Sequence, residues 1–98
     1  MAFQIRFEDK ATAHLGELTA RERALILDEI ERQLLNQPDV PARHRRQLRS
    51  KPLAKWQLSV DYFRVFYDVD EPRNEVVILA IGRERRKRLF IGGKAFKI

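Results

Sequence analysis

The segment WQLSVDYFRVFYDV, residues 56–69, gives the clearest structural signal in this chain of 98 residues. Apolar and polar residues alternate along it, which is the two-residue period of a half-buried β-strand. The short connection at residues 61–62 predicts a tight antiparallel hairpin. One face of that hairpin is apolar, and its members are Trp56, Leu58, Val60, Phe63, Val65, Tyr67 and Val69. The opposite face carries Gln57, Ser59, Arg64, Phe66 and Asp68.

Further strands are expected on both sides of this hairpin. EVVILAI, residues 75–81, is apolar on both faces and predicts a covered central strand that ends at Gly82. AFQIRFE, residues 2–8, alternates and predicts a first strand that joins the same sheet, because an isolated strand has no pairing partner. After Gly82 we expect a basic segment, a turn at the IGG of residues 91–93 and a short tail.

Two helices are predicted between the first strand and the hairpin. Asp9 offers an N-cap for the first, and Thr19 with Glu22 forms a capping box for the second. The second helix ends near residues 36–37, because Pro38 disfavours helix in the residue before it. Its expected buried stripe is Leu27, Ile30 and Leu34, widened by Ile26, and Asp28 is placed to pair with Arg32.

The expected order is therefore β-α-α-β-β-β in a single domain spanning residues 1–98. The fold class is α+β, with a helical hairpin packed on one face of an antiparallel-rich four-stranded sheet. The other face is only partly covered. Residues 37–52 form a long connection with three prolines, and a short strand or turn is expected at residues 47–49.

Charge is divided unevenly along the chain. Residues 1–42 carry a net charge of −3 and residues 43–98 a net charge of +9. The excess lies in RHRRQLRSKPLAK, residues 43–55, and in RERRKRLFIGGKAFKI, residues 83–98. Such blocks indicate either a polyanionic partner or a solvated, solubilising surface.

Several function classes are excluded or unsupported. The chain has no cysteine, so thiol catalysis, disulfides and zinc–thiolate sites are excluded, and a cytoplasmic location is expected. No apolar run is long enough for a transmembrane helix. The two histidines, His14 and His44, are too far apart in sequence to suggest a metal site, and no cofactor is expected. His44 lies in the basic loop, where it is either solvated or a titrating catalytic group.

Arg64 is unusual because it lies within an apolar strand. One interpretation is a phosphate site, since a guanidinium donates two parallel hydrogen bonds and stays charged. The alternative is an ion pair with Asp68 on the same face or with Glu84. Residue types alone leave both open.

The chain resembles the RelE/ParE superfamily of bacterial toxins from toxin–antitoxin pairs. The resemblance rests on the β-α-α-β-β-β order and on W-x-L-x-V-x-x-x-R-V-x-Y-D-V running into VVILAIGRERRKRLF. It covers nearly the whole chain and is strongest over residues 53–93. It implies a toxin of a type II system with a cognate antitoxin as partner.

RelE-like members cut mRNA on the ribosome without a metal, through attack of the ribose 2′-OH on the adjacent phosphodiester. The resemblance implies catalytic roles for Arg64 and for Arg83 or Arg85, with Lys55 or Lys51 replacing the lysines of the preceding strand. The basic blocks imply RNA contacts by Arg45, Arg46, Arg49, Lys51, Arg86 and Arg88, and Phe90 is placed to stack on a base.

Departures from the RelE pattern leave other functions open. The two strand lysines of the family align with Gln57 and Ser59, and the tyrosine near the C-terminus aligns with Phe90, which cannot transfer a proton. The general acid and base are therefore unassigned. One alternative is a ParE-type toxin that binds and blocks DNA gyrase. Another is a catalytically degenerate module that binds RNA or an antitoxin.

Overall fold

The computed structural model describes residues 2–49 and 53–96. Its elements follow the order β1 (Gln4–Phe7), α1 (Asp9–Gly16), α2 (Ala20–Leu34), β2 (Arg45–Gln47), β3 (Trp56–Val60), β4 (Phe63–Asp70), β5 (Glu75–Arg85), β6 (Arg88–Ile91) and β7 (Lys94–Phe96). The α+β class and the helical hairpin are confirmed, but the prediction of four strands was wrong. The described sheet has seven, because β6 and β7 are three- or four-residue strands with too little apolar periodicity to be recognised. The short strand or turn expected at residues 47–49 is the strand β2, which lies two residues earlier.

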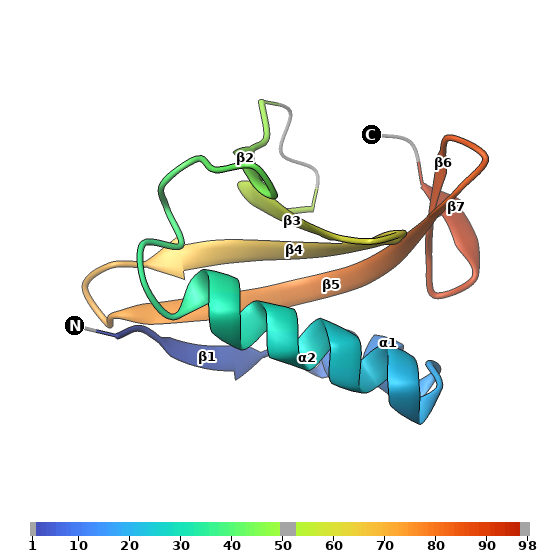
Figure 1. Cartoon of the computed structure of the whole chain (residues 1–98), viewed down its shortest axis with the longest axis horizontal. Helices are drawn as coiled ribbons and strands as arrows, with labels where there is room; N and C mark the ends of the chain where they lie inside the picture. Colours follow the sequence, from blue (N-terminus) through green and yellow to red (C-terminus); the bar gives the residue numbers. More distant parts are fainter. Residues whose placement is uncertain (1, 50–52, 97–98) are drawn as a thin grey trace.

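Strand β5 is the central strand of the sheet, because it pairs with three other strands (Figure 1). The strand order is β2-β3-β4-β5-β6-β7, and every pair along it is antiparallel. The start of β5 also pairs with β1 in parallel, from Gln4 opposite Glu75 to Phe7 opposite Ile78. The end of β5 pairs with β6, from Gly82 opposite Ile91 to Arg85 opposite Arg88. One strand thus joins the N-terminal and C-terminal parts of the chain.

The sequence predicted that this strand ends at Gly82. The prediction was wrong, because β5 continues to Arg85. The lack of a side chain at Gly82 allows β6 to approach closely. A Cβ at position 82 would lie 2.8 Å from Leu89 Cδ1 and 2.9 Å from the backbone oxygen of Phe90. The glycine is therefore a requirement of strand packing rather than a strand terminator.

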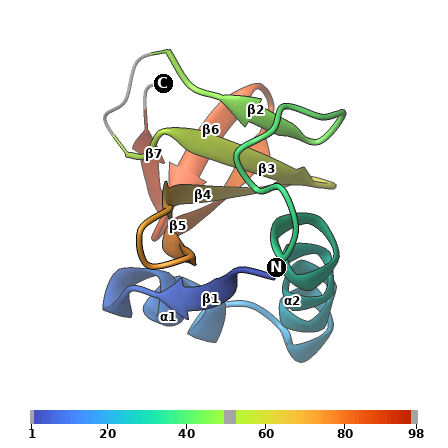
Figure 2. The ribbon, with the colours of Figure 1, turned by 90° about the vertical axis from the view of Figure 1, so that its left-hand side faces the viewer.

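The two helices cover one face of the sheet (Figure 2). Beneath them lies the main core, which includes Trp56, Leu58, Val65, Tyr67 and Ile78. The helix α2 contributes Ile26, Ile30 and Leu34, whereas Leu27 is 39% exposed, so the buried stripe begins one position earlier than predicted. The capping box of Thr19 and Glu22 is confirmed.

Two local predictions about the helices were wrong. Helix α1 begins at Asp9, and Glu8 occupies the N-cap position without a side-chain cap. Arg32 pairs with Glu29 three residues before it rather than with Asp28. The second change exchanges one ion pair for another on an exposed helix surface, where such pairs are worth roughly a few tenths of a kcal/mol.

The second face of the sheet is covered more fully than expected. A second apolar cluster contains Leu48, Ala54, Phe66, Ala80 and Leu89, which come from the connection before β3 and from β4, β5 and β6. Gln57 on this face is only 5% exposed. The late strands β6 and β7 therefore do the covering that no helix provides.

His14 bridges α1 and the sheet where β5 lacks a strand neighbour. Strand β1 pairs with β5 as far as Ile78 and β6 begins at Gly82. Between them, the backbone N–H of Ile81 donates to Nδ1 of His14 over 3.2 Å. Burial lowers the pKa of His14, Lys10 lowers it further and Glu17 opposes the shift. The imidazole must be unprotonated at Nδ1 to accept this bond.

No helix within residues 2–49 and 53–96 is long and apolar enough to cross a membrane.

Replacing Gly82 with alanine is expected to destabilise the fold by about 1–3 kcal/mol, since the added methyl overlaps the β6 backbone. The matched control is Gly16→Ala, because a Cβ at position 16 meets nothing within 4 Å and the residue ends a helix. Urea unfolding of both variants measures the difference. Equal stability of the two variants would contradict the packing argument.

Stability should fall at acidic pH through His14. Its pKa is lowered in the folded protein, so its contribution is present above the unfolded pKa of about 6.5 and is lost as pH falls from there toward the folded pKa. His14→Gln keeps an acceptor but removes the titration. The free energy of unfolding of wild type minus that of His14→Gln should decrease from pH 8 to pH 5. A difference that does not change with pH would refute the assignment.

Candidate functional site

Arg64 is held by three neighbours at the turn between β3 and β4. Its Nη1 donates to the backbone oxygens of Asp61 and Phe63, both over 2.8 Å. Its Nη2 donates to Oε2 of Glu84 over 2.9 Å. The Arg64 side chain is 17% exposed. Of the two interpretations of this residue, the structure shows the ion pair, and the partner is Glu84 rather than Asp68.

Arg83 lies on the opposite face of β5 from this ion pair. Arg64 is opposite Gly82 in the ladder, and Glu84 is two residues further along the same face, so Arg83 points the other way. Its Nη2 donates to Oε2 of Glu22 over 2.7 Å, and its guanidinium lies 4.9 Å from the ring centre of Phe63. The backbone N–H of Thr19 lowers the pKa of Glu22, and Arg83 lowers it further.

Lys55 is distant from both arginines. It precedes β3, and Ser59 is the β3 residue that pairs with Arg64. Four residues of extended strand separate Lys55 from Ser59, which is about 13 Å. The backbone N–H of Lys55 donates to Oδ1 of Asp68 over 2.7 Å. The structure therefore does not bring the four predicted catalytic cations together.

The first basic block is divided in its roles. Arg45 turns inward, where its guanidinium donates to the backbone oxygens of Val40 and Gln33 over 3.1 and 2.7 Å. It ties the long connection to the end of α2. Arg46 and Arg49 are exposed, and Lys51 lies outside the described residues.

Residues 85–88 of the second basic block form the tip of the β5–β6 hairpin. Arg85, Arg86, Arg88 and Phe90 line a surface depression of about 620 Å³. Among the described residues, Arg85, Arg86, Lys87 and Arg88 make no ion pair. Four cationic residues without a carboxylate partner among the described residues thus lie together at one hairpin, next to one aromatic ring.

Backbone conformation at this tip is unusual. Arg86 and Lys87 have φ values of 51° and 65°. A two-residue hairpin turn with both φ values positive is normally built from asparagine and glycine. Placing two long cationic side chains there costs about 1–3 kcal/mol each, which points to a use for their charge.

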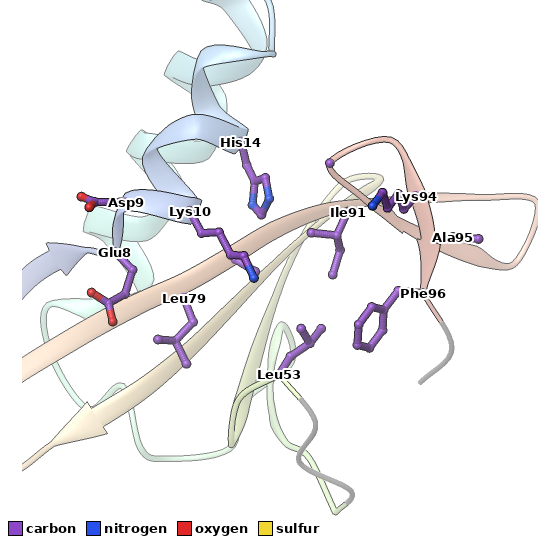
Figure 3. Close-up of a pocket in the computed structure, with 12 residues that line it drawn as sticks. Glu8, Asp9, Lys10, His14, Leu53, Leu79, Ile91, Lys94, Ala95 and Phe96 are labelled. Carbon is purple, nitrogen blue, oxygen red and sulfur yellow. The ribbon is translucent and has the colours of Figure 1, made fainter.

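A second depression lies between α1 and the β6–β7 hairpin and has a volume of about 810 Å³ (Figure 3). Leu53, Ile91 and Phe96 point toward one another across it, and His14 and Lys10 reach toward it from α1. Its floor is apolar and its charged residues are of both signs. No group of three or more potential metal ligands occurs within residues 2–49 and 53–96.

Sequence reasoning missed Tyr62, which lies in the β3–β4 turn and is 74% exposed. It borders a third depression of about 380 Å³, together with Glu22, Phe63, Arg83, Glu84, Arg85 and Arg86. The sequence did contain a signal that Tyr62 is exposed, because an aromatic residue in a two-residue turn between strands has no core to enter.

Solved structures of the same fold are toxins of toxin–antitoxin systems. The toxin–antitoxin complex RelBE2 of Mycobacterium tuberculosis contains a chain with 23% identity and a TM-score of 0.74, covering 86% of this chain and 93% of that one. A double arginine-to-alanine mutant of E. coli RelE in the free state has 21% identity and a TM-score of 0.66, with 85% and 84% covered. At these identities the likeness establishes the fold.

Sequence comparison identifies the family. Among curated proteins, none matches the chain. The model of the ParE toxin of the type II toxin–antitoxin system parDE matches residues 5–88. The predicted resemblance is confirmed, and the chain belongs to the ParE toxin family, within the RelE/ParE superfamily of type II toxin–antitoxin toxins.

Proposed function

We propose that this toxin arrests growth by binding and blocking a protein target, DNA gyrase, rather than by cutting mRNA. The observation that carries the proposal is the separation of the candidate catalytic cations. Arg64 and Arg83 lie on opposite faces of β5, and each is neutralised by a carboxylate, Glu84 and Glu22 respectively. A phosphorane transition state would need such charges to converge on one phosphate.

The positions where RelE-like enzymes carry proton-transfer groups also hold other residues in this chain. The cross-strand neighbour of Arg64 is Ser59, and Phe90 stands where RelE-like enzymes carry a tyrosine. Phenylalanine has no proton to give, and a serine hydroxyl is a weak base without a partner. A toxin that works by binding needs neither group, and the family match to ParE supports the same reading.

A cognate antitoxin is the second partner that the proposal includes. The structure of the related fold in RelBE2 is that of a toxin–antitoxin complex. A net charge of +6 favours an acidic antitoxin, and a segment that folds on binding would be able to wrap a toxin of 98 residues.

Ribosome-dependent mRNA cleavage is retained as the second candidate. It is favoured by the depression lined by Arg85, Arg86, Arg88 and Phe90, which combines cations with a stacking ring. His44 is a candidate imidazole, since its backbone oxygen accepts from Ser59 N–H over 2.8 Å and Ser59 pairs with Arg64. Two strand spacings, about 10 Å, separate it from Arg64, so cleavage would require a rearrangement or a group from the ribosome.

Purified toxin is expected to inhibit supercoiling by gyrase, and its expression is expected to leave mRNA 5′ ends unchanged. A gel assay of plasmid supercoiling and primer extension after brief induction measure the two effects. Catalytically inactive gyrase and an uninduced culture are the controls. New 5′ ends inside translated codons, with supercoiling unaffected, would sink the gyrase proposal in favour of the nuclease.

Arg64 is expected to act on stability rather than on chemistry. Arg64→Ala removes three hydrogen bonds from a largely buried guanidinium and should destabilise the fold by about 2–4 kcal/mol. Arg85→Ala, an exposed arginine on the continuing strand, is the control and should change stability by no more than about 0.5 kcal/mol. Thermal unfolding measures both. Equal stability of Arg64→Ala and Arg85→Ala would contradict the role of Arg64 in stabilising the turn.

A further inference from the structure

Tyr62 is the most exposed of the large apolar residues in the described part of the chain. It is 74% exposed, against 42% for Val40 and 39% for Leu25 and Leu27. A single exposed apolar side chain is ordinary on a protein surface. Tyr62 differs because the backbone around it is fixed and because Arg85 and Arg86, which make no ion pair among the described residues, line the same depression.

The turn that presents Tyr62 is held from two sides. Arg64 donates to the carbonyls on either side of Tyr62, those of Asp61 and Phe63, over 2.8 Å each. The backbone N–H of Glu84 in β5 donates to the carbonyl of Tyr62 itself over 2.7 Å, so the turn lies against β5 (Figure 1). A tyrosine has only two side-chain torsions, so a ring on such a support loses little entropy when it is bound.

The β5–β6 hairpin tip lies beside this turn. Glu84, which fixes Tyr62, is followed directly by Arg85 and by the turn at Arg86 and Lys87. Asp61 has a φ of 50°, so both turns hold non-glycine residues in the left-handed region. Two strained turns at one corner of the molecule indicate that their side chains are retained for contact.

The depression beside Tyr62 has mixed charge. It contains the ion-paired carboxylates Glu22 and Glu84 as well as Arg85 and Arg86, which have no carboxylate partner among the described residues. Carboxylates in the floor repel a phosphate backbone, which is negative along its whole length. A protein surface, with charges of both signs around an aromatic contact, matches this arrangement better.

We propose that Tyr62 and the arginine tip of the β5–β6 hairpin form the surface by which the toxin holds its protein target. Tyr62 is the anchor, and it enters a hollow on the target. Arg85 and Arg86 pair with acidic groups around that hollow. The inference rests on the proposed function, since it assigns to a particular surface the binding of a protein target. Tyrosine and arginine are the residue types that most often carry the energy of protein interfaces.

Binding of purified toxin variants to intact gyrase, measured by surface plasmon resonance, tests the surface. Tyr62→Ala is expected to weaken binding by roughly 30-fold, the effect of an interface anchor worth about 2 kcal/mol. Tyr62→Phe keeps the ring and should bind within about threefold of wild type. Arg86→Glu should weaken binding at least about tenfold through charge reversal.

Val40→Ala is the matched control, because Val40 is an exposed apolar residue near the opposite end of β4. Its backbone oxygen accepts from Arg45, and the neighbouring Pro38 oxygen accepts from Tyr67, four residues along β4 from Phe63. This variant should bind as wild type does. Thermal unfolding of each variant verifies that the fold is intact, which is expected because Tyr62 contributes little buried area.

The outcomes separate the inference from the function on which it rests. Wild-type toxin that fails to bind gyrase overturns the proposed function, and the inference falls with it. Wild-type binding that Tyr62→Ala and Arg86→Glu leave unchanged overturns the inference alone. Weakened binding of these variants to a single-stranded RNA oligonucleotide, with gyrase binding intact, assigns the surface to nucleic acid and also overturns it.

Discussion

Strand β5 has to pair with three strands, and the remaining structure depends on that requirement. It is antiparallel to β4 along one edge, and it is shared between β1 and β6 along the other. The pairing with β6 is possible only because Gly82 leaves room for Leu89 and the backbone of Phe90. Where neither β1 nor β6 reaches, His14 satisfies the free N–H of Ile81. The helices, the late strands and both apolar clusters are all assembled around this strand.

The same strand decides what the basic residues can do. Alternation along β5 sends Glu84 to the face of Arg64 and sends Arg83 to the face of the helices. Arg64 and Arg83 are thereby placed on opposite faces, and each is neutralised by its own carboxylate. Four cationic residues of the described chain that make no ion pair, Arg85, Arg86, Lys87 and Arg88, lie together at the hairpin tip. A binding surface follows from this geometry more directly than a catalytic centre does.

Much of the fold was predictable because its signals are local. The alternation of residues 56–69 placed β3 and β4, and the capping box of Thr19 and Glu22 placed the start of α2. Strands β6 and β7 were not predictable, and β2 was expected only as a strand or turn two residues later, since short polar strands form only because a partner strand is present. The role of Gly82 depends on the approach of β6, which no local pattern contains.

The candidate site was predictable in composition but not in arrangement. Asp68 and Glu84 were both candidates for Arg64, but only Asp68 was expected on its face. The register of β4 with β5, with Arg64 opposite Gly82, brings Glu84 close and leaves Asp68 to the backbone of Lys55. The resemblance to RelE-like enzymes grouped Arg64, Arg83 and Lys55 by motif, whereas register and strand length place them apart. Tyr62 was not predicted, because the predicted site rested on charged residues and Tyr62 is an uncharged aromatic residue at a turn.

The guanidinium of Arg64 is committed to the turn that it supports. Nitrogen-15 NMR of the arginine side chains tests this directly, with an RNA oligonucleotide as the challenge. We expect separate, exchange-protected Nη–H signals for Arg64 that do not move when RNA is added. The reason is that the carbonyls of Asp61 and Phe63 and the carboxylate of Glu84 already accept these hydrogen bonds. A single, rapidly exchanging signal that shifts on addition of RNA would contradict this expectation and would support a phosphate site at Arg64.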